Sequence, residues 1–316
     1  MKNFLFPLVF FVILTSFFFY KTIFLGFIPF PGDLLVGGYE PYKSYPFLGY
    51  APGGYPNKAQ DFDVLELLYP GKEFSIRMLK EGVFPLWNPF IFSGNPHLAS
   101  LQSGSFYPFN ILFFIFPFAS AWSLYIIIQP TLTVFFTYLL LKKFRLNILS
   151  SIFGSVVFAY SSYQVVWMEY GDIGHTIMWL PLAMWLVILN LEKTTVAKSL
   201  LLVLVLSMSL MSGYIQTTFY VLIFLFAFIV FYARYIDKKF WLKKLMVFVP
   251  IFILPLFLCA VQILPTLELI FHSSRLPYEK NSFFALLIPQ FHLATLFAPD
   301  FFGNPATRNY WLVGTY

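Results

Sequence analysis

The chain has 316 residues, of which 59% are hydrophobic, 22% aromatic and only 11% charged. Its mean hydropathy is +0.76, and a water-soluble protein of this size cannot bury that much apolar surface in one core. These values exclude an ordinary soluble globular protein and predict an all-α polytopic membrane protein. The net charge of +6 does not indicate nucleic-acid binding, because the basic residues flank apolar runs.

The first predicted element is a membrane-spanning helix at the N-terminus. A span needs about 20 mainly apolar residues, and residues 3–20 carry no charge. The apolar run continues through Lys21 to Phe30 without a small-residue cleavage site. We therefore expect residues 1–30 to form a retained signal anchor.

The second predicted region is an external loop over residues 31–104. An amphipathic helix at the membrane surface is expected over residues 72–80, after a break at Tyr69-Pro70-Gly71. Residues 84–96 are rich in proline and contain Gly94. That composition predicts an ordered loop with neither regular helix nor strand.

The third predicted region is a transmembrane bundle over residues 105–267. An interfacial helix at 105–117 precedes spans at 119–141, 146–168, 173–191 and 245–267 and a long uncharged stretch at 199–233. As one helix this stretch would be about 52 Å long, more than a bilayer core, so we expect Ser212-Gly213 to divide it into two spans. The total is about seven spans. Residues 268–316 form a second external loop, which we expect to continue beyond Tyr316 in a longer protein.

The distribution of charge predicts the orientation in the membrane. With Lys2 in the cytoplasm and the spans counted alternately, the short cytoplasmic loops contain ten basic residues beside only Glu192 and Asp237, as the positive-inside rule requires. The ten are Lys142, Lys143, Arg145, Lys193, Lys198, Arg234, Lys238, Lys239, Lys243 and Lys244. The other twelve of the fourteen carboxylates fall outside. We predict a multi-pass protein of the plasma (inner) membrane with a cytoplasmic N-terminus and an extracytoplasmic active face.

Two external acidic positions are candidates for chemistry. Asp61 and Asp63 form an Asp-x-Asp pair, and in an extended or turn segment both carboxylates point the same way. Such a pair can hold one divalent cation, Mg²⁺ or Mn²⁺, or leave one carboxylate as a base beside it. Asp33 follows the first span, at the level where a lipid-linked phosphate would lie. Solvated loop acids, or a turn cap at Asp33, would explain the same residues without chemistry.

A second group of candidates combines basic and acidic side chains. Asp172 and His175 lie at helical i, i+3 spacing beside Glu169. An ionisable group just inside a span is a functional candidate, and His175 can serve as a base, a phosphate donor or a metal ligand; a histidine at a helix start can also have no function. Arg77 and Arg275 are candidates for contacts with a substrate phosphate or with anionic lipid headgroups.

Other motifs exclude several enzyme classes. The single cysteine, Cys259, cannot form an intramolecular disulfide or a cysteine-based zinc cluster. His97, His272 and His292 lack the spacing of metal ligands and are interpreted as interfacial. The sequence contains no Walker motif and no Gly-x-Ser-x-Gly, so ATP-driven transport and serine hydrolysis are not indicated.

Three segments of the chain match one pattern in their order and spacing. They run from Asp63 to Pro96, with Pro-Leu-Trp-Asn-Pro at 85–89, then from Leu98 to Asn110, and from Leu296 to Asn304. Together they resemble the YfhO-like family of bacterial membrane proteins, which is related to the GT-C polyprenol-dependent glycosyltransferases. The resemblance covers most of the chain and includes residues 28–35.

The resemblance implies a membrane glycosyltransferase that uses a polyprenyl-phosphate sugar donor and an extracytoplasmic glycan, lipid or protein acceptor. It places Asp63 at the family's loop aspartate, the candidate general base, with Asp33 as second choice. The family's Tyr-Pro-Trp-Arg is replaced here by Tyr69-Pro70-Gly71-Lys72. The alternatives are a non-catalytic lipid or polymer transporter of the flippase type and a membrane scaffold subunit. The absence of charges midway along the spans favours an enzyme over a transporter.

Overall fold

The structure is a computed structural model that describes residues 2–54, 62–273, 289–304 and 309–311. It contains two compact units. The first combines residues 1–30 with residues 68–269, and the second combines residues 31–67 with residues 270–316.

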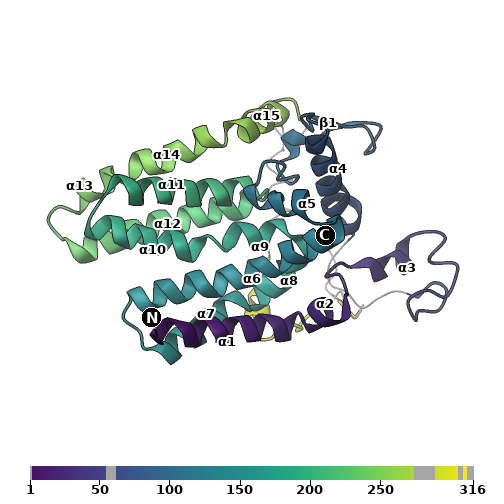
Figure 1. Cartoon of the computed structure of the whole chain (residues 1–316), viewed down its shortest axis with the longest axis horizontal. Coiled ribbons are helices and arrows are strands. Elements are labelled where there is room, and N and C mark those ends of the chain that lie inside the picture. The colour runs from purple at the N-terminus through teal and green to yellow at the C-terminus, as the bar shows by residue number, and fades with distance from the viewer. Residues whose placement is uncertain (1, 55–61, 274–288, 305–308, 312–316) are drawn as a thin grey trace. The chain divides into compact units, whose positions relative to one another are not determined.

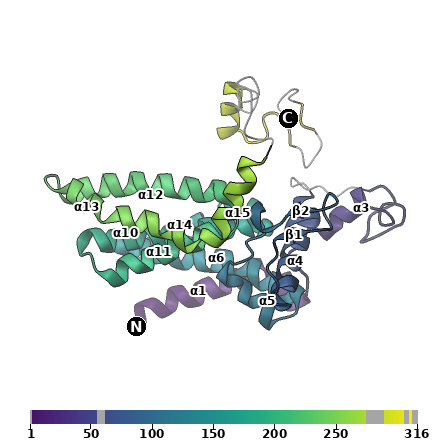
Figure 2. The same cartoon turned by 90° about the horizontal axis from the view of Figure 1, so that it is seen from above.

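The first unit is a bundle of helices (Figure 1). Its longer helices are α1 (Lys2–Phe18), α6 (Phe118–Lys143), α7 (Ile148–Ala159), α10 (Leu180–Glu192), α11 (Val196–Met211), α12 (Ile215–Ile236) and α14 (Phe248–Leu258). Its shorter helices are α2 (Tyr20–Leu25), α4 (Tyr69–Lys80), α5 (Ile111–Ile115), α8 (Ser162–Trp167), α9 (Asp172–Ile177), α13 (Trp241–Met246) and α15 (Ala260–Phe271). Helix α6 packs against α1, α7 and α10, and α11 packs against α10 and α14. Helices α13, α14 and α15 follow one another along the upper edge of the bundle in Figure 1, and α14 is drawn below α12 in Figure 2.

The apolar helices of the described residues support a multi-pass membrane protein. Four helical segments, Phe118–Lys143, Asp172–Glu192, Ile215–Ile236 and Trp241–Leu258, are long and apolar enough to cross a membrane. A fifth span results if the pair Ile148–Ala159 and Ser162–Tyr170, bent by 45°, is counted as one. Three further apolar helices are shorter, at 5–18, 196–211 and 260–271. The fold class is therefore confirmed as helical and membrane-like, with four or five spans by length and composition among these residues.

The predicted turn within the long uncharged stretch is confirmed. Helix α11 ends at Met211 and α12 begins at Ile215. Gly213 has a φ of +115°, and a Cβ there would lie 3.1 Å from the carbonyl oxygen of Leu101. Glycine is required because other residues rarely adopt this φ and because the two backbones approach closely.

Several buried polar residues inside the bundle are satisfied by their own helix. Thr133, Thr137, Ser155, Asn190 and Ser207 each donate a side-chain hydrogen bond to the carbonyl oxygen four residues earlier, at 2.6 to 3.0 Å. This pattern satisfies a hydroxyl donor without a partner on another helix. The amide oxygen of Asn190 also accepts from the Ser199 hydroxyl of α11 at 3.0 Å. Hydrogen bonds within the same helix therefore offset the free-energy cost of burying these polar groups.

Helix α4 begins earlier than the sequence predicts. A π-helical turn, η2 (Val64–Leu68), is followed directly by α4 at Tyr69, so the expected break at Tyr69-Pro70-Gly71 was wrong. Pro70 lies in the first turn of α4. A proline is tolerated there because its missing N–H would have no partner within the helix.

The loop over residues 84–96 also differs from its prediction. A short antiparallel pair, β1 (Trp87–Asn88) and β2 (Asn95–Pro96), sets Trp87 opposite Pro96. Gly94 has a φ of +122°, and a Cβ there would lie 2.5 Å from the indole of Trp87. The prediction of no strand was wrong for these four residues, because the glycine lets the chain reverse beneath the indole.

The predicted interfacial helix at 105–117 is shorter in the structure. It consists of a 3₁₀ turn, η4 (Pro108–Asn110), followed by α5, which ends at Ile115. Phe116 and Pro117 are extended, and α6 begins at Phe118. Proline fixes its own φ and disfavours helix at the residue before it, which explains this break.

The second unit contains short helical turns. These are η1 (Gly32–Leu34), α3 (Leu35–Gly38), most of η2, and η6 (Gln290–Leu296). Leu34 and Val36 are fully buried. The Tyr39 hydroxyl donates a hydrogen bond to the Glu66 carboxylate, which raises the pKa of Tyr39 to about 12. The hydrogen bond joins residues 27 positions apart within the unit.

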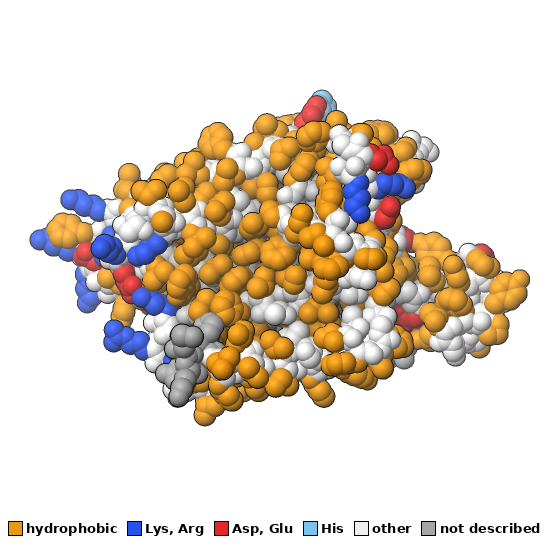
Figure 3. All heavy atoms as spheres, viewed as in Figure 1, with side chains coloured by type: hydrophobic (Ala, Val, Ile, Leu, Met, Phe, Trp, Pro, Cys, Tyr) orange, Lys and Arg blue, Asp and Glu red, His pale blue; other side chains and the backbone are white. Residues whose placement is uncertain are grey.

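One end of the bundle is strongly basic. The Lys and Arg side chains gather where α10 joins α11 and α12 joins α13, whereas the visible middle of the bundle is almost uniformly hydrophobic (Figure 3). Lys143 at the end of α6 pairs with Glu192 at the end of α10, with 2.6 Å between Nζ and Oε2. This is the end that the sequence assigns to the cytoplasm.

Candidate functional site

The first unit buries a cluster of polar side chains between α4 and the loop that precedes α5. This Lys72 cluster consists of Lys72, Ser75, His97, Ser103, Ser105 and Asn110, and each is at most 7% exposed. Lys72 and Ser75 lie three residues apart on α4, so they share one face of that helix. Buried polar groups need hydrogen-bond partners, and the cluster supplies them internally.

Lys72 is the buried cation of the cluster. Its Nζ donates to the Ser103 carbonyl oxygen at 3.0 Å and to Asn110 Oδ1 at 3.2 Å, and it lies 5.3 Å from the centroid of the Tyr125 ring. Burial lowers the pKa of Lys72 to about 8, and the negative charge of Asp172 opposes this shift. Lys72 therefore remains protonated at neutral pH.

Ser75 and His97 form the other half of the cluster. The Ser75 hydroxyl lies 2.7 Å from His97 Nε2 and 3.0 Å from the Ser105 hydroxyl, and Ser105 donates to the Ser103 hydroxyl at 2.9 Å. Burial lowers the pKa of His97 to about 4, opposed by a hydrogen bond to the Gly71 backbone and reinforced by the charge of Lys72. The neutral imidazole of His97 thus links the loop before α5 to α4 through its hydrogen bond with Ser75.

His175 on α9 is held by a separate set of partners. Its Nε2 lies 2.8 Å from the Tyr125 carbonyl oxygen, so this nitrogen carries the proton and donates. Nδ1 then accepts from the Tyr107 hydroxyl at 3.0 Å, and Trp179 Nε1 donates to the same hydroxyl at 3.2 Å. The imidazole stacks on Tyr125 with 3.9 Å between ring centroids. His175 is fully buried, and both of its ring nitrogens form hydrogen bonds. These surroundings are those of a structural histidine in the core.

A small polar cavity lies between Lys72 and Asp172. It measures about 10 Å³ and is lined by Leu68, Lys72, Gln102, Trp122, Tyr125, Tyr170, Gly171 and Asp172. Within the described part of the chain the buried Tyr125 hydroxyl has no hydrogen-bond partner. A cavity of about this volume holds one water molecule. It can hydrate the buried charges, but it is too small for a sugar or a lipid phosphate.

The two predicted catalytic aspartates lie in the second unit. Asp63 is exposed and directly precedes η2. Asp33 lies in η1 and is half-buried. Their catalytic roles stay predictions. Asp61, the proposed metal partner of Asp63, lies outside the described residues.

The remaining predicted residues occupy different surroundings. Arg77 on α4 is exposed, pairs loosely with Glu73 at 3.9 Å and lies 5.8 Å from the centroid of the Phe74 ring. Asp172 and His175 share α9, but the structure does not bring them together: the Asp172 carboxylate accepts from the Ile173 N–H at 2.7 Å. Arg275 lies outside the described residues.

A metal site is not visible in the described ranges. In residues 2–54, 62–273, 289–304 and 309–311, no group of three or more His, Cys, Asp or Glu side chains could hold a metal ion. The predicted pair of Asp61 and Asp63 is not covered by this result, because Asp61 is not described. Mg²⁺ or Mn²⁺ binding therefore stays a prediction.

The chain matches no protein-family model, no curated protein and no solved structure. The site must therefore be judged on its geometry alone.

Sequence reasoning missed the Lys72 cluster. In the sequence, Lys72 differs from the family's arginine and His97 is predicted to be interfacial. One signal is present in the sequence: Gly71 precedes Lys72, and a Cβ there would lie 3.5 Å from the His97 ring. Hydrogen bonds from Lys72 and Ser75 join α4 and the loop at 97–110 into one platform around the buried lysine.

Proposed function

We propose that this chain is a membrane glycosyltransferase that transfers a sugar from a polyprenyl-phosphate donor to an extracytoplasmic acceptor. The observation that carries the proposal is the chemical difference between the two ends of α6. The ring of Tyr125, near its start, lies 5.3 Å from the ammonium group of the buried Lys72, whereas Lys142 and Lys143 end the helix in the basic region. The positive-inside rule assigns the second end to the cytoplasm. The platform around Lys72 then lies at the extracytoplasmic side, where lipid-linked sugars are used.

Seven crossings are part of this proposal. Besides the four helices that pass by length and composition and the bent pair at 148–170, two shorter apolar helices, at 5–18 and 196–211, occupy the positions of the other predicted spans. The third short helix, at 260–271, overlaps the end of the predicted span at 245–267 and is not counted as a further crossing. An odd number of crossings from a cytoplasmic N-terminus places residues 31–104 and 268–316 outside. These segments hold most of the acidic residues of the chain.

The proposed chemistry needs a base for an acceptor hydroxyl. The acceptor oxygen forms a bond to the anomeric carbon, the bond from that carbon to the lipid phosphate breaks, and the phosphate leaves with the electron pair. Asp63 takes the proton of the hydroxyl. Its exposure allows an acceptor to reach it from water, and Asp33 is the second choice. Arg77 of the first unit, also exposed, is a separate candidate for contact with a substrate phosphate, because guanidinium binds phosphate oxygens in pairs.

The distribution of charge within the helices supports an enzyme over a transporter. In the four longest apolar helices, Asp, Glu, Lys and Arg occur only in the first or last few residues. Ion-coupled or charge-carrying transport usually relies on ionisable groups midway through the membrane. A glycosyltransferase needs its charged groups at the membrane surface instead.

The test is transfer of radiolabelled sugar in membranes that contain the chain. A panel of polyprenyl-phosphate sugars serves as donors, and label is followed into lipid, polymer and protein fractions. Asp63→Asn should lower transfer by about 10² to 10⁴, the usual contribution of a general base. Glu73→Gln is the matched control, because it also converts one exposed carboxylate to an amide, and it should leave transfer within about twofold.

Two results would contradict the proposal. Wild-type transfer in Asp63→Asn would remove Asp63 from the mechanism, and Asp33→Asn would then be measured as the second choice. No transfer with any donor, from chain shown to be folded and inserted, would remove the enzyme assignment. Chelation of divalent cations in the same assay tests the predicted role of Asp61 and Asp63 as metal ligands.

A further inference from the structure

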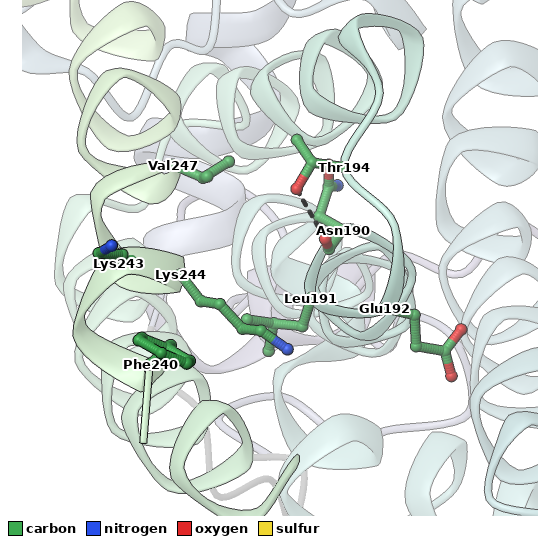
Figure 4. A pocket seen from close by; sticks show the side chains of 8 residues that line it. All are labelled: Asn190, Leu191, Glu192, Thr194, Phe240, Lys243, Lys244 and Val247. Atoms are coloured by element: carbon green, nitrogen blue, oxygen red, sulfur yellow. Dashed lines mark hydrogen bonds between the residues drawn. The ribbon is translucent and has the colours of Figure 1, made fainter. Parts of the chain in front are cut away.

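The basic end of the bundle contains a second cavity, far larger than the one beside Lys72. It measures about 300 Å³, which is at the lower limit for small-molecule sites. Its lining comes from the end of α10 and from α13 and its flanks, namely Asn190, Leu191, Glu192, Thr194, Phe240, Lys243, Lys244 and Val247. Figure 4 shows these side chains around the cavity.

The cavity presents a positive charge that is only weakly compensated. Lys244 points into it, whereas Glu192 points away (Figure 4). The Glu192 carboxylate is already paired with Lys143 at 2.6 Å. The pairing of Lys244 with Asp237 is loose, with 3.9 Å between Nζ and Oδ2. An anion in the cavity would therefore meet an ammonium group whose charge is not neutralised by a close contact.

The wider surroundings add to this charge. Ten basic residues and only two acidic ones lie in the loops at this end of the bundle. The Lys243 ammonium lies 5.4 Å from the centroid of the Phe240 ring, at the edge of the cavity. A phosphate placed there would be attracted by both lysines of α13 and by the field of the whole region.

The other walls of the cavity are mixed: Asn190 and Thr194 are polar and joined by a hydrogen bond of 2.9 Å from the Thr194 hydroxyl to the Asn190 carbonyl oxygen, and the rest are apolar. Leu191 and Val247 line the interior, and Phe240 is 47% exposed at the edge. Leu242 and Met246 on α13 are also exposed, at 61% and 69%. A helix that alternates lysines with exposed apolar side chains is suited to the boundary between headgroups and acyl chains.

We propose that this cavity binds the phosphate headgroup of an anionic phospholipid from the leaflet at the basic end. Lys243 and Lys244 contact the phosphate, and the exposed apolar residues of α13 lie along the acyl chains. Basic pockets between membrane helices on the cytoplasmic side bind such headgroups in general. The proposal does not depend on the glycosyltransferase assignment, because it concerns the opposite end of α6.

The experiment measures lipid retention on the purified full chain by native mass spectrometry. Phosphatidylglycerol and phosphatidylcholine with identical acyl chains are compared in the same detergent. The test variant is Lys243→Gln/Lys244→Gln, and its matched control is Lys142→Gln/Lys238→Gln, which removes the same charge from the same end outside the cavity lining. With about fivefold in affinity for each lysine that contacts the phosphate, the test variant should lose about 30-fold, and the control, which removes only surface charge, should lose several-fold less.

A third variant keeps the proposal testable if the double lysine variant does not fold. Val247→Phe leaves every charge in place and fills part of the cavity, so it should also lower retention of phosphatidylglycerol. Folding of all variants is checked by elution as a single species and by their unfolding temperature without added lipid.

Three outcomes would overturn the proposal. Equal losses of phosphatidylglycerol retention in the test and control variants would mean that the lipid is attracted by diffuse surface charge and is not bound at a site. Equal retention of phosphatidylcholine by the wild type would mean that the headgroup is not recognised. Displacement of the lipid by soluble glycerol phosphate at similar concentrations would identify a soluble phosphate ester, and not a lipid, as the ligand.

Discussion

The buried lysine of α4 gives the sharpest test of the fold. Lys72→Met keeps the length of the side chain but removes the ammonium group that donates to Ser103 and Asn110 and that faces Asp172. Hydrogen bonds from a charged donor contribute about 1.5 to 3 kcal/mol each, and the Asp172 carboxylate on the other side of the small cavity loses the attraction of the buried cation. These contributions overlap, so we expect the free energy of unfolding to fall by about 4 kcal/mol.

A double-mutant cycle separates the charge pair from the hydrogen bonds. Asp172→Asn removes the carboxylate and leaves the lysine with its two acceptors. The double variant Lys72→Met/Asp172→Asn contains neither of these two buried charges. Its free energy of unfolding should therefore fall by about 2 kcal/mol less than the sum of the two single losses. Unfolding of the purified chain in mild detergent, followed by helical circular dichroism against denaturant, measures all four proteins under one condition.

The cycle can refute the reasoning in two ways. If Lys72→Met unfolds within about 0.5 kcal/mol of the wild type, Lys72 does not hold α4 to the loop. If the losses of the single variants simply add, the charges of Lys72 and Asp172 do not interact in the folded chain. Lys80→Met, an exposed change on the same helix, controls for the effect of methionine on α4.

Two further predictions concern the same loop. Burial lowers the pKa of His97 to about 4, so between pH 6.5 and 4 the unfolded chain binds a proton that the folded chain does not. The free energy of unfolding should therefore fall by up to about 3 kcal/mol as the pH is lowered over this range. His97→Gln, which still offers an amide to Ser75, should lose this part of the pH dependence, and an unchanged pH profile of stability would contradict the prediction. Gly94→Ala should lower the free energy of unfolding by about 3 kcal/mol, because its Cβ overlaps the Trp87 ring at a positive φ. Gly82 also has a positive φ, +73°, but its Cβ would lie in open space, so Gly82→Ala should cost about 1 kcal/mol. Equal melting shifts for the two variants would exclude overlap with Trp87 as the cause.

The helical segments were predictable because their signal is local. Uncharged runs bounded by lysines and arginines mark α6, α10 and α12, and Gly213 marks the turn before α12. The break at Tyr69-Pro70-Gly71 was wrong because a proline and a glycine in a first turn resemble a loop in sequence. Their position in the helix decides whether they are tolerated.

The candidate site was less predictable because its contacts are distant in sequence. The i, i+3 spacing of Asp172 and His175 predicts a shared site, but the partner of His175 is Tyr107, 68 residues away. Lys72 similarly finds Asn110 across 38 residues. Helical periodicity places a side chain on a face, and it does not say which loop covers that face. Asp63 and Asp33, in contrast, stay predictions from the sequence and the resemblance.

The hydrogen bonds from Thr133, Thr137, Ser155, Asn190 and Ser207 to their own helices have a consequence for biogenesis. A segment that satisfies its hydroxyls internally enters lipid without waiting for a neighbour to be synthesised. Such segments can leave the translocation channel one at a time and assemble afterwards. The exceptions are side chains such as Ser209 of α11, whose hydroxyl donates to the Thr176 carbonyl oxygen of α9 at 3.1 Å. Late assembly defects should therefore arise around α9 and the turn after α11, even when every segment inserts normally.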